Sequence, residues 1–232
     1  MAIRHSIVLA TFAAGGIVFA NSVSASVVCL NATQGSHNFG PDSSCAAGTE
    51  LEVTLQDAKD VTTGFGNVKT TTAVMEFTST DALDLASGNA TITPAAKGGA
   101  ASFSNLDISV PGFRFTDLVF GLQLLDTHNS GGEDLTVTAW SGTTQELSFT
   151  YDSSSMNGLP HDSLITFTVA DASGLTAVDL SSTTGIKEAK GFDASGVAAI
   201  PETSTWAMML AGLLGLGFAG YRRTQAGRLD IG

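Results

Sequence analysis

The stretch 135-LTVTAWSGTTQELSFTY-151 alternates apolar and polar residues on both sides of a short polar segment. Because successive side chains of an extended chain point to opposite faces, a period of two is typical of strands that bury one face. The stretch therefore predicts two β-strands, each with an apolar face and a polar face. The apolar positions are Leu135, Val137 and Ala139, and then Leu147, Phe149 and Tyr151.

The same alternation recurs along the chain, and helical periodicity is nearly absent. It covers residues 50–56, 165–169 and 176–180, whereas residues 113–125 are more continuously apolar, as a strand covered on both faces would be. Many short strands separated by turns predict an all-β fold, an antiparallel β-sandwich of jelly-roll or similar type. The turn signals include Ser87-Gly88-Asn89, Gly98-Gly99, Pro111-Gly112, Asn157-Gly158 and Ala172-Ser173-Gly174.

The N-terminal end is typical of a secretory signal peptide. Arg4 supplies a positive charge, residues 7–19 are apolar, and Val23-Ser24-Ala25 offers the small residues of a cleavage site. A permanent N-terminal helix is the alternative, but the apolar stretch is short and polar sequence follows it. We expect residues 1–25 to be removed during export, so that the mature chain begins near Ser26.

The C-terminal end combines three short parts. Pro201 and Glu202 come first, an uncharged apolar run over residues 206–221 follows, and Arg222 and Arg223 close the segment. A helix of that length covers roughly 24 Å, somewhat less than the ~30 Å hydrocarbon core of a bilayer. It would span a membrane only with help from its flanks, where long arginine side chains reach toward the headgroups.

This order of parts resembles the PEP-CTERM sorting signal, in which a Pro-Glu motif, a glycine-rich hydrophobic helix and an arginine cluster are recognised by a membrane-embedded exosortase. The segments TSTWAMMLAGLLGLG and GYRR carry the likeness, and a threonine stands where the family has the proline of its third motif position. The resemblance implies a Gram-negative host and a β-rich secreted body. Carried over, the parts are a processing motif (Pro201, Glu202, Thr203), a transient transmembrane anchor (206–221) and a cytoplasmic stop (Arg222, Arg223).

Between the two ends, residues 26–199 form the expected single domain, and residues 200–232 form the sorting tail. The chain has 22 Asp and Glu residues against 10 Lys and Arg, a net charge of −12. This balance disfavours nucleic acid as a partner, because affinity for phosphates comes from cationic residues. Within the domain, residues 191–199 are expected to leave the last strand and form a short flexible spacer, a role that suits their glycines and small residues.

Cys29 and Cys45 are the only cysteines in the chain. In an exported protein an oxidised pair is chemically favoured, so we expect one disulfide bond between them. The alternative is a zinc site that enlists His37, which lies between the two cysteines. Two thiolates and one histidine in an oxidising compartment are a poor zinc ligand set.

The segment 126-DTHNSGGED-134 is the candidate metal site. Hard oxygen ligands on a glycine-bearing loop suit Ca²⁺, but the EF-hand pattern fails because His128 and Ser130 stand at its third and fifth positions. Two interpretations stay open: a weak Ca²⁺ site, or a solvated hairpin loop that joins the strand 113–125 to the strand 135–139. The candidate ligands are Asp126, Asn129, Glu133 and Asp134.

The sequence contains no catalytic motif of the common hydrolase or nucleotide-binding kinds. The three histidines of the domain, His37, His128 and His161, stand far apart. Carbohydrate binding is an alternative, since Trp140 near a strand end could present its ring to a sugar. Burial of this tryptophan at the edge of the core is the competing interpretation, and the more favoured one.

Together these observations predict an exported protein that passes the inner membrane, is transiently anchored there, and ends at the cell surface or in the extracellular matrix. It would be a structural or adhesive component rather than an enzyme. An exosortase-type enzyme is the expected partner, extracellular polysaccharide is a candidate contact, and no cofactor is expected. The alternatives are a carbohydrate- or Ca²⁺-binding module and, after these, a secreted hydrolase.

Overall fold

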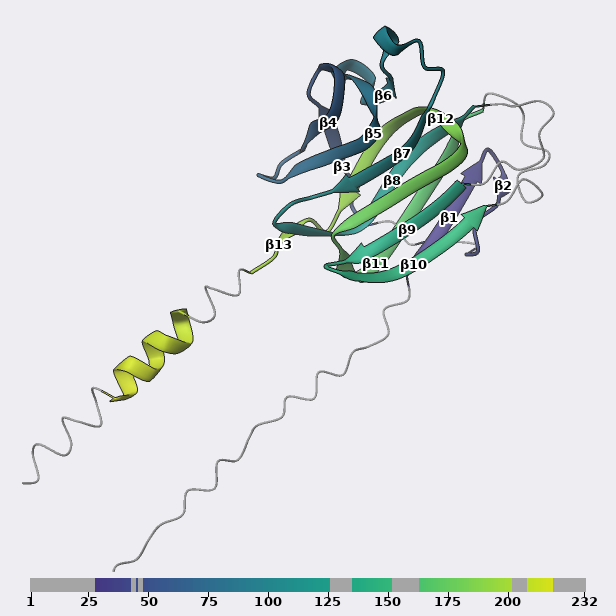
Figure 1. Cartoon of the computed structure of the whole chain (residues 1–232). Coiled ribbons are helices and arrows are strands. Elements are labelled where there is room, and N and C mark those ends of the chain that lie inside the picture. The colour runs from purple at the N-terminus through teal and green to yellow at the C-terminus, as the bar shows by residue number, and fades with distance from the viewer. Residues whose placement is uncertain are drawn as a thin grey trace, which may run out of the picture.

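The computed structural model describes residues 28–42, 45, 48–125, 135–151, 163–201 and 208–218. Within these ranges thirteen strands pair in one continuous antiparallel network (Figure 1), which confirms the expected antiparallel all-β class. Two short 3₁₀ turns, η1 (Ser87–Asn89) and η2 (Ala96–Gly98), interrupt the strands. In chain order the strands are β1 Cys29–Gln34, β2 His37–Asn38, β3 Leu51–Leu55, β4 Ala58–Val68, β5 Val74–Ala86, β6 Thr91–Pro94, β7 Phe103–Ser109, β8 Phe113–Leu124, β9 Leu135–Ser141, β10 Thr144–Tyr151, β11 Ile165–Leu175, β12 Ala177–Ser195 and β13 Ala198–Ala199.

Strand β12 organises the fold because it changes partners along its length. Its first half lies between β7 and β9, where Leu180 is paired with Leu106 on one side and Val137 on the other. Its second half lies beside β8, with β6 and β3 on the opposite side. A single chain segment therefore belongs to two groups of strands.

Strand β5 changes partners in the same way. Phe77 in its first part is paired with Ile108 of β7, whereas Leu85 in its last part is paired with Ile92 of β6. The first group of strands runs β10–β9–β12–β7–β5–β4, and the second runs β2–β1–β11–β8–β12–β6. The two long strands connect these groups.

The inward-facing residues of both groups form one continuous hydrophobic core. Phe120 of β8 lies between two other rings, with centroid distances of 5.5 Å to Phe167 and 6.3 Å to Phe192. Phe192 in turn contacts Phe77 of the first group at 4.8 Å. Aromatic pairs at these distances add to the free energy gained by burying each ring.

The strands expected from alternation are confirmed. Residues 50–56 contain β3, the stretch 135–151 contains β9 and β10, and residues 165–169 begin β11. The continuously apolar stretch is β8, which is paired with β11 on one edge and β12 on the other. Burial on both faces and pairing on both edges explain why β8 lacks alternation.

The expectation of a hairpin between the strands at 113–125 and 135–139 was wrong. Strand β8 is paired with β11, β12 and β13, whereas β9 is paired with β10 and β12. The segment 126–134 therefore connects strands of different groups. Its own residues lie outside the described ranges. Alternation reports which strands exist but does not report their partners.

The flexible spacer expected at residues 191–199 was also wrong. Residues up to Ser195 complete β12, and Ala198 and Ala199 form β13 on the edge of β8. The backbone N–H of Ile200 then donates a hydrogen bond of 2.8 Å to the carbonyl of Gly112. The chain is thus held against the body up to the residue before Pro201.

The turn expected at residues 172–174 lies inside β11 as an irregularity between Ala170 and Leu175. The buried carboxylate of Asp171 accepts hydrogen bonds from the N–H and the hydroxyl of Ser173, at 2.8 and 2.9 Å. Gly174 has a positive φ of 92°. Turn residues therefore produce a local bulge here, and the strand continues.

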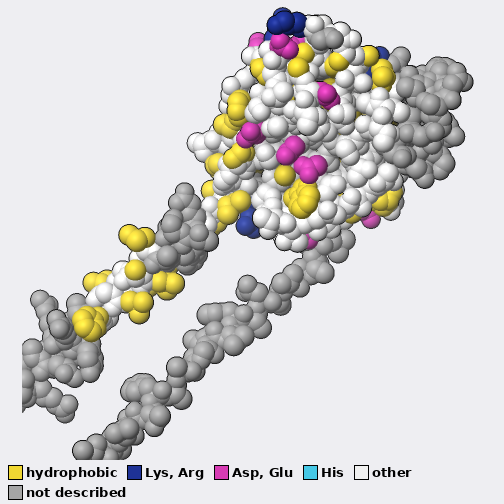
Figure 2. Space-filling model, viewed as in Figure 1, with side chains coloured by type: hydrophobic (Ala, Val, Ile, Leu, Met, Phe, Trp, Pro, Cys, Tyr) yellow, Lys and Arg dark blue, Asp and Glu magenta, His cyan; other side chains and the backbone are white. Residues whose placement is uncertain are grey.

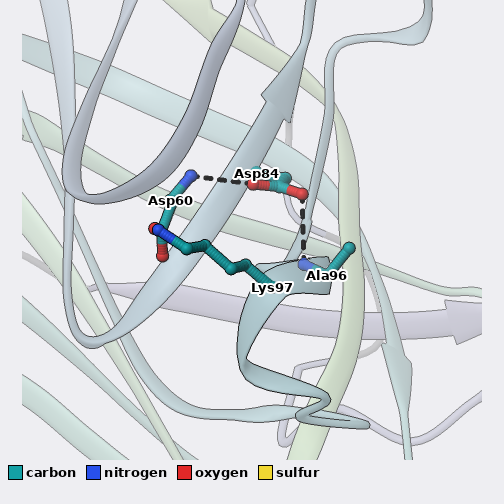
Figure 3. Close-up of polar contacts among 4 residues, drawn as sticks. All are labelled: Asp60, Asp84, Ala96 and Lys97. Atoms are coloured by element: carbon teal, nitrogen blue, oxygen red, sulfur yellow. Dashed lines mark hydrogen bonds and ion pairs between the residues drawn. The ribbon is translucent and has the colours of Figure 1, made fainter.

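Asp84 of β5 holds an irregular edge of the first group in place (Figure 3). Its carboxylate accepts hydrogen bonds from the N–H of Asp60 at 2.8 Å and of Ala96 at 3.2 Å, and these bonds lower the pKa of Asp84. Asp60 has a positive φ of 56°, which non-glycine residues seldom adopt. Lys97 Nζ lies 3.3 Å from the Asp60 carboxylate and adds an exposed ion pair.

Beyond the last strand, residues 208–218 form a helix whose side chains are all exposed. This helix lies inside the apolar run expected over residues 206–221. In the parts of the chain that the structure describes, no helix has both the length and the apolar character needed to cross a membrane.

Replacement of Gly66 by alanine tests how closely the core packs against β4. An added Cβ would lie 2.7 Å from Val53 Cγ1, 3.1 Å from Leu55 Cδ2 and 3.2 Å from Phe77 Cε2. Overpacking of this kind costs about 1–3 kcal/mol, so G66A should lower the free energy of urea unfolding by that amount. The control is Gly88→Ala, where nothing lies within 4 Å of the added Cβ. Equal stability of the two variants would contradict this packing.

Candidate functional site

The outward-facing residues of the first group of strands form a surface that we call the outer face. Cross-strand pairing arranges these residues in three rows. The hydroxyl row contains Thr150, Thr136, Ser181 and Asn105, on β10, β9, β12 and β7. The acidic row contains Ser148, Thr138, Asp179, Asp107 and Thr78, and the tryptophan row contains Trp140, Ala177, Ser109 and Glu76.

A groove of about 570 Å³ lies over the hydroxyl row. It opens beside the point where β12 leaves its regular pairing with β7, after Ser181, and its pairing with β9, after Ser182. Every side chain that lines it is neutral and carries a hydroxyl or an amide. The lining residues are Thr80, Ser104, Asn105, Thr136, Thr150, Ser181, Ser182 and Thr183.

Hydrogen bonds within the wall hold several of these groups in place. The Oδ1 atom of Asn105 accepts bonds from the N–H of Thr80 at 3.1 Å, its hydroxyl at 2.8 Å, and the hydroxyl of Ser79 at 3.1 Å. Because a backbone N–H can only donate, it fixes which end of the amide faces Thr80. On the other wall, the hydroxyls of Thr136 and Thr150 lie 2.9 Å apart.

Asp81 supports the groove wall from one end. Its carboxylate accepts hydrogen bonds from both the N–H and the hydroxyl of Ser104, each at 2.7 Å. These bonds lower the pKa of Asp81, so the group keeps its negative charge at neutral pH.

Next to the groove, two carboxylates of the acidic row face each other across neighbouring strands. Asp107 of β7 is paired with Asp179 of β12. Partial burial raises the pKa of Asp107 to about 6, and the negative charges of Asp179 and Glu76 add to the effect. Burial also raises the pKa of Asp179, while the indole N–H of Trp140, which donates to its Oδ2 atom at 2.6 Å, acts in the opposite direction.

The hydrogen bond to Asp179 settles the position of Trp140. The side chain occupies an outward position of β9, between the inward-facing Ala139 and the strand end, and it does not belong to the buried core. Its burial at the edge of the core was therefore a wrong expectation. Its ring belongs instead to a polar face, fixed in orientation by a carboxylate.

The expected disulfide between Cys29 and Cys45 is confirmed. Together with Asp42 these cysteines are the one group of three close potential metal ligands in the described residues. Both sulfurs are oxidised and Asp42 accepts a hydrogen bond from the N–H of Leu30 at 2.9 Å. The zinc alternative with His37 was therefore wrong.

Other expected site residues fall outside the described ranges. These are the candidate calcium ligands Asp126, Asn129, Glu133 and Asp134, and, in the tail, Glu202, Thr203, Arg222 and Arg223. Pro201 is described and exposed. His37 on β2 is the one histidine in the described residues, and it is exposed near Phe39.

The groove was missed from the sequence because its lining comes from five strands. A weak signal existed, since hydroxyl residues cluster at 78-TST-80 and 181-SSTT-184. These clusters interrupt alternation at the places where β5 and β12 change partners. Only the strand pairing shows that these two clusters lie on the same face.

The arrangement can donate and accept many neutral hydrogen bonds, and it places carboxylates beside them. The face seen in Figure 2 carries acidic side chains near its middle, while its basic side chains lie at the margins. Comparison with protein-family models, with curated proteins and with solved structures found no significant match to this chain.

The variant Asp179→Asn should lower the pKa of Asp107, because it removes the negative charge that contributes most to raising it. Carboxyl NMR titration would measure the change. Glu146→Gln is the control, since it removes a negative charge that does not contribute to the pKa of Asp107. If both variants shift the titration of Asp107 equally, the pairing across β7 and β12 does not control it.

The carboxyl group of Asp107 also makes the stability of the fold depend on pH. Its folded pKa of about 6 lies above the unfolded value near 3.9, so between these values the native state binds more protons at Asp107. The contribution of Asp107 to stability therefore rises as the pH falls from about 6 to about 4. Asp107→Asn should flatten that part of a pH–stability curve measured by urea unfolding, and an unchanged slope would contradict the assignment.

Proposed function

We propose that the chain is an exported protein of the cell surface or extracellular matrix, a structural or adhesive component sorted through its C-terminal segment. The exposed helix at 208–218 is the observation that carries this proposal. Its large apolar side chains are 50–75% exposed, among them Met208, Leu213 and Leu214. A contiguous apolar surface of this kind indicates contact with a lipid phase or with another protein.

The disulfide supports delivery to an oxidising space. Cys29 lies in β1 and Cys45 sixteen positions later, so the bond closes the segment between them onto the second group of strands. Closing a loop of that length stabilises the fold by about 3 kcal/mol in the chain-entropy model. Such bonds persist mainly outside the cytosol.

For the body, residues 26–199, we propose a β-sandwich of jelly-roll type. The partner changes of β5 and β12 favour it, because strands that pass between two layers are a common way to build corners in such folds. The single core that draws residues from both groups of strands agrees with this architecture.

For the tail, we propose that Pro201, Glu202 and Thr203 are the processing motif for an exosortase-type enzyme. Residues 206–221 would be the transient membrane anchor, and Arg222 and Arg223 its cytoplasmic end. In support of this, the N–H of Ile200 donates a hydrogen bond to the carbonyl of Gly112, so the chain is held against the folded body up to the residue before Pro201. The enzyme would then act close to the surface of the domain, without an intervening spacer.

A carbohydrate-binding module is the second candidate, favoured by the neutral groove and by Trp140 on the outer face. Nothing in the described residues supports the Ca²⁺-binding alternative or a hydrolase. Among the residues that the structure describes, the outer face presents no histidine, and its paired carboxylates, Asp107 and Asp179, lie outside the groove lining.

Deletion of residues 201–223 tests the sorting proposal in a host that carries an exosortase-type system. The shortened chain should leave the cell envelope and accumulate in the medium, with its disulfide intact, because the anchor is lost but the body is not. Fractionation followed by intact-mass analysis would locate the shortened and the full-length protein, and the mass of the full-length protein would report both processing sites.

The matched control deletes residues 224–232, which keeps the motif, the apolar run and both arginines. This variant should be sorted like the full chain. Recovery of an untrimmed, reduced chain from the cytosol would contradict export, and retention of the 201–223 deletion at the surface would contradict the role of the tail.

A further inference from the structure

The groove on the outer face lies where two strands change partners. Strand β5 leaves β7 after Thr78 and meets β6 at Leu83, and β12 loses its regular pairing with β7 after Ser181. The groove lies where both strands leave this regular pairing. Thr80 and Ser182 line it from these two strands.

The groove is long and shallow across the strands. Its lining extends from Thr150 on β10 to Thr80 on β5. At a strand spacing of about 4.8 Å, five neighbouring strands span roughly 19 Å. This shape suits a section of an extended chain better than one compact small molecule.

The lining fixes the chemistry of its ligand. Hydroxyl groups both donate and accept hydrogen bonds, and the Asn105 amide, held by Thr80 through its oxygen, has N–H groups to donate. Several lining hydroxyls already form one hydrogen bond within the wall, such as Ser104 to Asp81 and Thr80 to Asn105, but each hydroxyl has one donor and two acceptor sites. An apolar ligand would leave the remaining sites unused and shielded from water, at a cost for each one. A ligand rich in hydroxyl groups can satisfy them.

The surroundings of the groove disfavour two other kinds of ligand. Asp81 holds one end and Asp107 and Asp179 lie one row away, so a polyanion such as nucleic acid or an acidic polysaccharide would be repelled. A peptide that adds a strand does not suit the middle of the groove. Binding of that kind needs a free sheet edge, and β12 and β7 in the middle already have neighbours on both sides, whereas β10 at one end is paired only with β9 among the described strands.

We propose that this groove binds a strand of an uncharged polysaccharide across β10, β9, β12, β7 and β5. Ser181 forms the centre of its floor, between Thr136 and Asn105. Asn105 donates to the sugar hydroxyls from a fixed orientation, and the Thr136–Thr150 pair lines the other end. The inference rests on the adhesive role proposed above and gives it a ligand.

The test is calorimetry and glycan-array binding with the full-length chain in mild detergent. The probes are hexasaccharides of glucose, of mannose and, as the acidic comparison, of galacturonic acid. We expect at least one neutral hexasaccharide to bind and the acidic one not to bind. Ser181→Tyr, which fills the floor of the groove, should abolish the signal.

The matched control is Thr54→Tyr, which puts the same ring on an exposed position of β3 away from the groove. It should bind like the wild type. Asn105→Asp keeps the acceptor that Thr80 uses but removes the two N–H donors and adds a negative charge, so we expect at least about a tenfold loss of affinity. Circular dichroism and unfolding temperature would verify that each variant is folded.

Absence of binding by either neutral hexasaccharide at millimolar concentration would overturn the proposal, and so would equal binding by the Ser181→Tyr variant. Stronger binding of the acidic hexasaccharide would overturn it as well. These outcomes leave the sorting proposal standing, because localisation is measured separately with the 201–223 deletion. Conversely, if the groove binds glycan but the chain stays in the cytosol, the export proposal is refuted and the glycan proposal stands.

Discussion

The pairing of β12 with two different groups of strands is the constraint on which the rest of the structure depends. Its first half fixes the register of β7 and β9, and its second half fixes that of β8. Phe192, near its end, contacts Phe77 from one group and Phe120 from the other. Since each buried phenylalanine contributes about 1.5–3 kcal/mol, a loss of register in this strand would expose the centre of the core.

A strand that passes from one group of strands to the other must satisfy its backbone where regular pairing stops, and both long strands do so with a buried serine. The hydroxyl of Ser79 in β5 accepts from the N–H of Asp81 at 3.1 Å, and that of Ser182 in β12 accepts from the N–H of Gly185 at 3.1 Å. Such groups are costly when buried without partners. Of these two serines, Ser182 itself lines the groove, and Ser79 directly precedes the lining residue Thr80. The change of partners in β5 and β12 therefore determines both the fold and the position of the groove.

Local pattern was enough to predict much of the fold but little of the site. Alternation located β3, β9, β10 and β11, and continuous apolarity located β8, because these signals depend on burial of a single strand. Strand β4, which contains Gly64 and Gly66, was not predicted, because glycines that face the core do not count as apolar positions in an alternating pattern. The hairpin error at 126–134 and the spacer error at 191–199 have a shared cause. Both concern partners distant in sequence, which no period of two can report. The groove is lined by residues of five strands, so it could be predicted only if the pairing of all five were known.

The exit of the chain joins the body to its tail in a way that suits a tethered protein. The buried carboxylate of Asp117 on β8 accepts hydrogen bonds from Ser195 at the end of β12, from Thr116, and from the N–H of Gly48. Three residues after Ser195, strand β13 begins and pairs with the edge of β8. A force applied through residues 201–218 would therefore act on β8, which lies inside the network and is paired with β11 and β12 along its length. The groove lies on another part of the surface, over β12 and β7, so a tethered body would leave that face open to a polysaccharide in its surroundings.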